Sequence, residues 1–321
     1  MKIIIPGGSG QMGTLLARHF ASEGHEIVVL SRNPTTTPWR TVDWDAQTLG
    51  SWVSELESAD LVINMAGRSV NCRYGKRNRK AILDSRVNST RVVGEAIAKC
   101  NRPPALWLQA STATIYSHRY NSSNDEEHGI LGGGEPGVPT TWRFSIDVAK
   151  AWEEAMDSVP TPHTRKVKLR SAMTMSADRG GVFDVLLRLV RLRLGGRAGD
   201  GRQYVSWIHG DDFIRAIEFI IAHPELDGPV NLASPYPLPN VDFMRELREA
   251  WGVSIGLPAS RWMLELGAFL LRTETELILK SRRVIPRRLV DLGFEFKFNT
   301  WAEASRDLCL QRRRESTRPR R

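Results

Sequence analysis

Three glycines close to the start of the chain have the spacing of a phosphate-binding turn, G-x-x-G-x-x-G. They follow an apolar stretch, residues 2–5, and open an amphipathic stretch, residues 12–23, with helical spacing. In such a unit the first glycine permits a tight turn, the second lets the backbone approach a pyrophosphate, and the third lets the helix pack on the sheet. An ordinary strand-to-helix turn is the alternative. The predicted dinucleotide contacts are Gly7, Gly10, Gln11, Met12 and Gly13.

The end of the second predicted strand, residues 26–30, indicates which dinucleotide would bind. Sites for NAD usually place Asp or Glu there, to accept a hydrogen bond from the ribose 2′-OH, whereas this chain has Ser31, Arg32 and Asn33. A guanidinium pairs with a 2′-phosphate, which a carboxylate would repel. We therefore predict NADP(H) as the cofactor, with these three residues beside the phosphate. A solvated surface arginine is the alternative interpretation of Arg32.

Three further arginines suit an anionic substrate. Arg68 and Arg73 follow the predicted strand at residues 60–64, and Arg202 ends a glycine-rich run at residues 195–202. Arginines held by glycine turns can bind a phosphate or a carboxylate through two parallel hydrogen bonds. We therefore predict a small, polar and anionic substrate. For each arginine, exposure to solvent without a ligand is the alternative.

The elements that must position these residues alternate along the first half of the chain. Strands are predicted at residues 2–5, 26–30, 42–44, 60–64, 105–110 and 166–170, and helices at 12–23, 79–100 and 144–156. This alternation is typical of a parallel sheet covered on both faces. We expect an α/β fold of the Rossmann type, a doubly wound parallel sheet that binds ligands at the carboxyl ends of its strands.

The second half of the chain is less regular and predicts a smaller, mainly helical C-terminal lobe. Residues 1–170 should form the NADP-binding Rossmann domain, completed by about residues 205–234. Residues 171–204 and 235–305 should form the substrate-side lobe. The arginine-rich tail, residues 306–321, lacks periodicity and is predicted to be disordered. Two helices of the lobe are expected near residues 241–251 and 260–271, and a functional or mobile loop at 117–141.

Composition limits the class of protein. The 321 residues carry a net charge of +9, much of it in the tail, and 41% are apolar. No apolar run is long enough to cross a membrane, and the first residues enter a strand without a signal peptide. The three cysteines are scattered and lack metal spacing, so we expect reduced thiols, no metal and a cytoplasmic location. We expect no nucleic-acid partner because no recognition motif accompanies the basic tail, and a homodimer is left open.

Several stretches together resemble one family. They are Gly7-Gly8-Ser9-Gly10 with Ser31-Arg32-Asn33-Pro34, Asn64-Met65-Ala66-Gly67, ILDSRV at 82–87, SWIH at 206–209 with Asp212, RVIP at 283–286 and GFEF at 293–296. The chain resembles an extended, atypical member of the short-chain dehydrogenase/reductase superfamily, in the nucleotide-sugar-epimerase-like branch with a C-terminal domain of unknown function. The glycine motif is generic, but the SWIH and C-terminal stretches are specific to that branch. The resemblance implies epimerase or oxidoreductase chemistry on a small polar substrate, such as a nucleotide-linked sugar.

The same resemblance implies site residues and leaves one gap. In the superfamily a Tyr and a Lys four residues later perform acid–base chemistry, and a Ser or Thr polarises the substrate oxygen. Ser111 matches the Ser and Lys150 matches the Lys, but Ile146 stands at the position of the Tyr and cannot transfer a proton. The implied cofactor contacts are Ala66, Gly67, Asn88 and Lys150.

The missing tyrosine leaves two readings open. In the first, Tyr116, five residues beyond Ser111, serves as the acid and base, with Glu127 and His118 as weaker candidates on the same loop. An aromatic side chain packed beneath the loop is the alternative for Tyr116. In the second reading no proton moves, and the protein binds NADP(H) as a sensor or regulator. We favour the first, with Ser111, Tyr116 and Lys150 as catalytic candidates.

Overall fold

A parallel β-sheet forms the centre of the molecule. The computed structural model describes residues 1–34, 36–260, 262–265 and 274–317. Within these residues the sheet has seven strands in the order β10-β6-β5-β4-β1-β2-β3. The strands are β1 (Lys2–Pro6), β2 (Glu26–Ser31), β3 (Arg40–Asp43), β4 (Leu61–Asn64), β5 (Leu106–Thr112), β6 (Arg165–Ser171) and β10 (Gly228–Leu232). The strand order reverses between β1 and β4, where ligands bind in such sheets, and the predicted Rossmann-type fold is confirmed.

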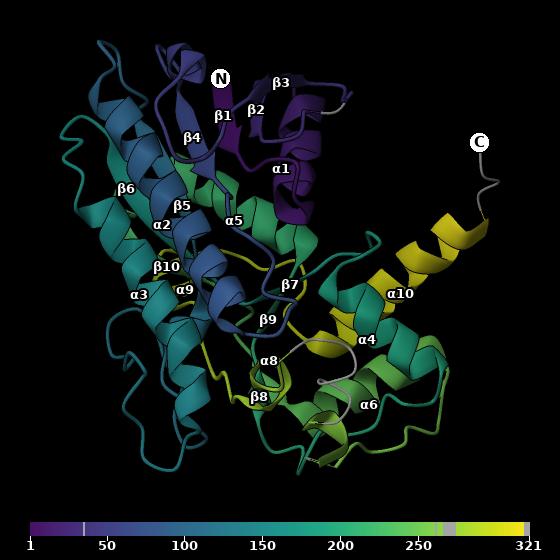
Figure 1. Cartoon of the computed structure of the whole chain (residues 1–321). Helices are drawn as coiled ribbons and strands as arrows, with labels where there is room; N and C mark the ends of the chain where they lie inside the picture. The colour runs from purple at the N-terminus through teal and green to yellow at the C-terminus, as the bar shows by residue number, and fades with distance from the viewer. Residues whose placement is uncertain (35, 261, 266–273, 318–321) are drawn as a thin grey trace.

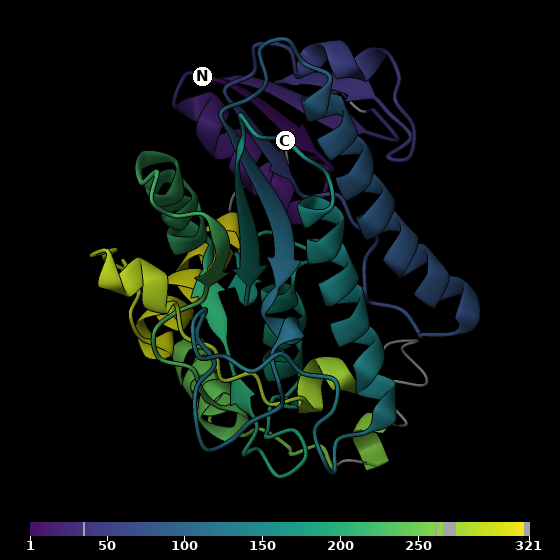
Figure 2. The same cartoon turned by 90° about the vertical axis from the view of Figure 1, so that its left-hand side faces the viewer.

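Helices cover both faces of this sheet because its strands are apolar on both sides. The helices α2 (Lys76–Ala98) and α3 (Arg143–Asp157) run side by side along one face (Figures 1 and 2). The helices α1 (Gln11–Ser22) and α5 (Gly210–Ala222) cover the other face. Alternate residues of β1 enter the two cores: Ile3 and Ile5 pack toward α1 and α5, and Ile4 packs toward α2.

A smaller and mainly helical lobe follows. It contains α4 (Val182–Arg191), α6 (Asn240–Trp251), α8 (Glu276–Leu279) and α10 (Trp301–Thr317), whereas α9 (Arg287–Asp291) packs against β10 and contributes Leu289 to the core of the sheet. Two short strand pairs accompany them: β7 (Met173–Met175) with β9 (Trp207–His209), and β8 (Tyr204–Val205) with β11 (Leu238–Pro239). The helix α6 packs against both α4 and α10, and the three lie together at one corner of the molecule (Figure 1). The helix predicted near residues 260–271 falls largely outside the described residues.

Short 3₁₀ turns complete the connections. They are η1 (Ser51–Glu55), η2 (Ala113–Ile115) and η3 (Thr140–Trp142). The second of them directly follows β5, so it shapes the carboxyl edge of the sheet where a site is expected. Among the described residues, no helix is long and apolar enough to cross a membrane, and no group of three metal-ligating side chains is present.

The predicted disorder of the tail is wrong as far as Thr317. Helix α10 extends through this segment, and Leu308 and Cys309 are buried in the core of the small lobe. The reason is a helical spacing of apolar residues, Trp301, Ala304 and Leu308, which the arginine-rich composition conceals. Arg312 pairs with Asp184 on α4 and donates to the Ala177 carbonyl. Residues 318–321 lie outside the described residues.

This packing predicts a stability loss that a disordered tail would not give. Leu308→Ala removes a fully buried side chain, so the free energy of unfolding should fall by about 2–4 kcal/mol. Leu310→Ala, on the same helix with its side chain half exposed, is the matched control and should change that free energy by less than about 0.5 kcal/mol. Urea unfolding of the two variants measures both values. Equally small losses of unfolding free energy in both variants would mean that α10 does not pack on the small lobe in solution.

Candidate functional site

The glycine turn between β1 and α1 is held by close backbone contacts. Gly7 has a positive φ of 72°, and a Cβ atom there would lie 2.6 Å from the Ala66 Cα atom. A Cβ atom on Gly13 would lie 2.4 Å from the Gly8 Cα atom. These contacts confirm that Gly7 permits the tight turn and that Gly13 permits close packing.

Gly10 has a different environment from the other two glycines. A Cβ atom there would meet only the Gly7 carbonyl oxygen, at the ordinary distance of 3.5 Å. Helix α1 begins directly afterwards, and no side chain caps its first turn at Gly10. Because the first N–H groups of a helix lack partners within the helix, this open turn can accept an anion at close range.

A cavity of about 430 Å³ lies in front of this turn. The predicted cofactor residues on its wall are Gly7, Gly10, Ser31, Arg32, Ala66, Gly67 and Asn88. The predicted residues that are not on its wall are Gln11, Met12, Gly13, Asn33 and Lys150. The cavity therefore joins the carboxyl ends of β1, β2 and β4 with one side of α2, as expected at a topological switch point.

Arg32 lies at the mouth of this cavity with its guanidinium exposed. It makes no hydrogen bond or ion pair to the part of the chain that the structure describes. The neighbouring turn is ordered by Ser31, whose hydroxyl donates to Ser9 Oγ at 3.1 Å and accepts from the Asn33 N–H at 3.3 Å. A fixed turn beside an arginine without a carboxylate partner suits a phosphate group.

The far wall of the cavity contains residues that sequence reasoning missed: Trp44, Asp45 and Gln47. Asp45 accepts hydrogen bonds from Thr48 Oγ1 at 2.6 Å and from the Thr48 and Gln47 N–H groups at 2.8 Å. These bonds, that of the Thr48 side chain above all, lower the pKa of the Asp45 carboxyl. These residues directly follow β3. Because ligands bind at the carboxyl ends of parallel strands, the position after the third predicted strand could have indicated them.

Ser111 does not line the cavity. Its hydroxyl donates to Glu153 Oε1 at 2.6 Å, and both residues are buried between β5 and α3. Glu153 also forms a bidentate pair with Arg170, through Nε at 2.9 Å and Nη2 at 2.8 Å. The side chain of Ser111 is thus engaged in a buried hydrogen bond, and its catalytic role stays a prediction.

The adjacent residue of β5, Thr112, also carries a hydroxyl. Successive residues of a strand point to opposite faces, and Thr112 at the tip of β5 is only half buried. Its side-chain oxygen accepts from the Thr114 N–H at 3.2 Å, which fixes its orientation at the start of η2. Thr112 is therefore a half-buried hydroxyl at the end of β5, one residue from the predicted one, and like Ser111 it lies outside the cavity wall.

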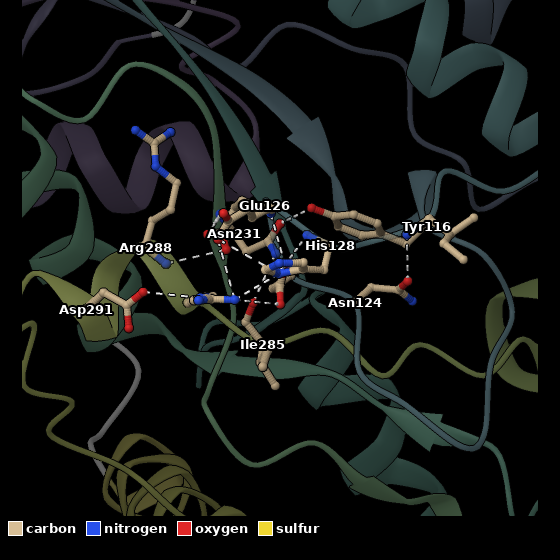
Figure 3. A network of polar contacts seen from close by, with 12 residues as sticks. Tyr116, Asn124, Glu126, His128, Asn231, Ile285, Arg288 and Asp291 are labelled. Atoms are coloured by element: carbon tan, nitrogen blue, oxygen red, sulfur yellow. Dashed lines mark hydrogen bonds and ion pairs between the residues drawn. The ribbon is translucent and has the colours of Figure 1, made fainter.

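Tyr116 is also engaged inside the protein. Its side chain is 2% exposed, its hydroxyl donates to Asn231 Oδ1 at 3.0 Å, and Arg170 Nη1 donates to it at 2.9 Å. Figure 3 shows the ring pointing toward Asn231, next to Glu126. Burial raises the pKa of Tyr116. These contacts correspond to the packed aromatic alternative, so the predicted catalytic role of Tyr116 is not supported.

The long loop that follows Tyr116 is tied to the C-terminal segment. Glu126 accepts from the Asn231 N–H at 2.8 Å and from the Arg288 N–H at 3.4 Å. Arg287 contacts His128 at 2.8 Å and pairs with Asp291 at 3.3 Å (Figure 3). Two further candidates on this loop have ordinary roles. Glu127 is exposed and lies 3.5 Å from Arg287, and His118 Nδ1 accepts from the Ser281 N–H.

Lys150 lies on the exposed side of α3. Its ammonium donates to the Gly132 carbonyl oxygen at 2.8 Å, and Ile146 packs against the same glycine of the loop. The loop therefore covers the face of α3 that Ile146 and Lys150 share. Neither residue reaches the wall of the cavity, and a ribose contact for Lys150 has no support in this position.

The three predicted substrate arginines do not form one group. Arg68 donates to Asn78 Oδ1 at 3.1 Å, and Arg73 pairs with Glu274 at 3.7 Å, both at the start of α2. Arg202 is exposed in the small lobe, where its backbone N–H binds Asp200. No contact within the described residues joins Arg202 to the other two.

A buried group of charges beside the tip of β5 was not predicted. Lys280 is 1% exposed and donates to the Thr114 carbonyl at 2.8 Å, and Glu276 is 3% exposed and accepts from Ser145 Oγ at 2.7 Å. Burial lowers the pKa of Lys280 to about 8 and raises the pKa of Glu276. Perturbed groups of this kind gather at functional sites as well as in structural networks. Lys280 and Glu276 lie just before residues 283–286, in a segment whose sequence alone does not indicate a functional role.

Lys280 should give the protein an alkaline pH dependence. Its ordinary pKa is 10.5 and its folded pKa about 8, so the unfolded state binds more protons between these values. Stability should therefore rise with pH in this window, by about 2–3 kcal/mol relative to Lys280→Met. Below pH 8 Lys280 is protonated in both the folded and the unfolded state. The difference in unfolding free energy between the wild type and Lys280→Met should therefore be constant there. Urea unfolding from pH 7 to 10 measures it, and a difference independent of pH would contradict the burial of the charge.

The doubly wound parallel sheet, the glycine turn at its switch point and the cavity in front of them define a Rossmann-type nucleotide-binding architecture.

Comparison with known proteins identifies the family. Residues 3–131 match the model of the NAD dependent epimerase/dehydratase family, and residues 259–308 match a domain of unknown function, DUF1731. An epimerase family protein of Staphylococcus epidermidis is 30% identical over 313 residues, which cover 96% of this chain and 98% of the relative. The chain therefore belongs to the epimerase family, within the short-chain dehydrogenase/reductase superfamily, and the predicted resemblance is confirmed.

Solved structures agree with this assignment. The structure of human epimerase family protein SDR39U1 with NADPH has a TM-score of 0.84 and 26% identity, covering 97% of this chain and 99% of the human one. A nucleoside-diphosphate sugar epimerase from Corynebacterium glutamicum has a TM-score of 0.75 and 24% identity, covering all of this chain and 62% of that one. The second likeness concerns the fold alone.

Proposed function

We propose that this chain binds NADP(H) in the cavity at the switch point and carries out epimerase or oxidoreductase chemistry on a small polar substrate, such as a nucleotide-linked sugar. The observation that carries the proposal is the exposed guanidinium of Arg32, without a carboxylate partner among the described residues, beside an open glycine turn. NADPH in the human relative supports the choice of cofactor. Residues 1–170 and about 205–234 would hold the dinucleotide, and residues 171–204 and 235–305 would cover the substrate.

The residues present fit this cofactor. Arg32 and the Ser31 hydroxyl would hold the 2′-phosphate, and the open turn at Gly10 would hold the pyrophosphate. Ala66, Gly67 and Asn88 line the opposite side of the cavity and would contact the rest of the dinucleotide. When bound, the nicotinamide supplies hydride transfer. Among the chain's own groups, the Thr112 hydroxyl is the candidate to donate a hydrogen bond to the substrate oxygen.

A second function has specific support. Ser111 and Tyr116 are engaged in buried contacts, and Ile146 replaces the superfamily tyrosine beneath a covering loop. These observations favour a non-catalytic protein that binds NADP(H) as a sensor or regulator. The two functions share the cofactor site and differ in turnover.

Turnover separates the two functions. Purified protein with NADPH or NADP⁺ is incubated with a panel of nucleotide sugars, while nicotinamide absorbance reports net redox and chromatography reports epimers. Catalysis predicts a product, and Thr112→Val should slow its formation about tenfold or more at unchanged NADPH affinity. NADPH binding without any product across the panel would favour the sensor. Equal rates in Thr112→Val would remove Thr112 from the proposal.

A further inference from the structure

Arg86 on α2 lies beneath the connection from β4 to α2. Its Nη1 atom donates to the Arg68 carbonyl oxygen at 3.0 Å and to the Ile82 carbonyl oxygen at 3.2 Å. Gly67, on the wall of the cavity, lies directly over it, since a Cβ atom there would be 3.3 Å from Arg86 Cζ. The guanidinium is thus fixed by two hydrogen bonds directly behind Gly67, although Arg86 itself is not on the cavity wall.

The charge of this guanidinium is not neutralised by the protein. No carboxylate lies within ion-pair distance of it among the described residues, whereas the buried Arg170 has Glu153 and the nearby Arg73 has Glu274. Its contacts are two neutral carbonyls and the Trp152 ring, whose centroid lies 4.9 Å from Cζ. Burial lowers the pKa of Arg86, although only to about 10, so the group is charged at neutral pH. An unbalanced cation in such surroundings would be stabilised by an anionic ligand.

One edge of the guanidinium has no hydrogen-bond partner among the described residues. Both hydrogen bonds of the guanidinium use Nη1, and within the described chain Nε and Nη2 donate to no protein atom. These two N–H groups form the edge that binds an oxyanion through two parallel hydrogen bonds, while the indole supports the planar face.

The position of Arg86 points to the substrate rather than to the cofactor phosphates. The open turn at Gly10 and Arg32 follow β1 and β2, on one side of the switch point. Arg86 lies on the other side, beyond β4, where α2 packs against Trp152 of α3. In a dinucleotide that crosses the switch point, this side receives the reactive end.

We propose that Arg86 is the anion-binding residue of the substrate site and selects substrates that carry a carboxylate or a phosphate. The proposal rests on the proposed function, because it places the substrate beside an NADP(H) site. Arg86 would then bind the anionic group of the substrate, which is the role that the sequence predicts for Arg68, Arg73 and Arg202.

The test uses NADPH-loaded protein and two probes, inorganic phosphate and succinate, each exchanged for chloride at constant ionic strength. Calorimetry measures their binding to the wild type, Arg86→Met and Arg86→Lys. Arg77→Met is the matched control, because Arg77 is exposed on the same helix and the substitution removes the same charge. At least one probe should bind the wild type, and Arg86→Met should weaken it about tenfold or more. The probe that responds distinguishes phosphate from carboxylate recognition.

The controls define the remaining outcomes. Arg77→Met should bind the probe within about twofold of the wild type, and Arg86→Lys should keep part of the affinity, because it keeps the charge but loses the planar fork. NADPH affinity should stay within about threefold in all variants. The proposal fails if neither probe binds the wild type, if both bind Arg86→Met equally well, or if they compete with NADPH. Failure of the proposed function is separate, since NADPH would then not bind the wild type before any probe is added.

Discussion

Arg32→Glu should weaken NADPH binding about 100-fold or more and leave NADH binding within about threefold of the wild type. The substitution removes the guanidinium that we place beside the 2′-phosphate and puts a repelling carboxylate in its position. NADH has no 2′-phosphate. Its binding therefore does not depend on an ion pair with Arg32 and is not weakened by repulsion from the introduced glutamate. Fluorescence titration of both coenzymes at one salt concentration measures the two dissociation constants.

The matched control for this substitution is Arg102→Glu. Arg102 is exposed just before β5, at the amino edge of the sheet and therefore opposite the cavity, and the change in net charge is the same. Its NADPH affinity should stay within about twofold of the wild type. If Arg32→Glu weakens NADH as strongly as NADPH, Arg32 does not contact the 2′-phosphate.

Arg170→Met should cost about 3–5 kcal/mol of unfolding free energy, the largest stability loss that we predict. Arg170 is buried, forms a bidentate pair with Glu153 and donates to the Tyr116 hydroxyl. Removing the guanidinium leaves the Glu153 carboxylate inside the protein without its cation. Urea unfolding of the wild type and the variant measures the loss.

The double variant Arg170→Met with Glu153→Met tests the cause. It removes both charges, so it should be more stable than Arg170→Met alone, by about 1–3 kcal/mol. A double variant less stable than the single one would show that packing, not the unpaired carboxylate, explains the loss. Preserved NADPH affinity in the folded single variant is also expected, because none of these residues lines the cavity.

The sequence could predict the fold and the glycine turn because both depend on local patterns. Alternating strands and helices require a parallel sheet covered on both faces, and the turn at Gly7 needs a backbone that only glycine adopts without strain. The tail shows the limit of composition. Its arginines indicate disorder, but Trp301, Ala304 and Leu308 share one helical face that packs on the small lobe.

The catalytic residues could not be predicted in the same way, because their roles depend on the direction of single side chains and on distant partners. Ser111 and Thr112 are adjacent, and the alternation of a strand decides which face of the sheet each side chain points to. Tyr116 is buried because Asn231 and Arg170 come to it from β10 and β6. Spacing along the chain contains no information about such partners.

Calorimetric titration of the wild-type protein with NADPH and, separately, with NADH tests the central claim most directly. We expect saturable binding of NADPH in the cavity at the switch point, about tenfold or more tighter than that of NADH, because only NADPH carries the phosphate for Arg32. Folded protein that gives no heat with either coenzyme, or that binds NADH as tightly as NADPH, would contradict the account.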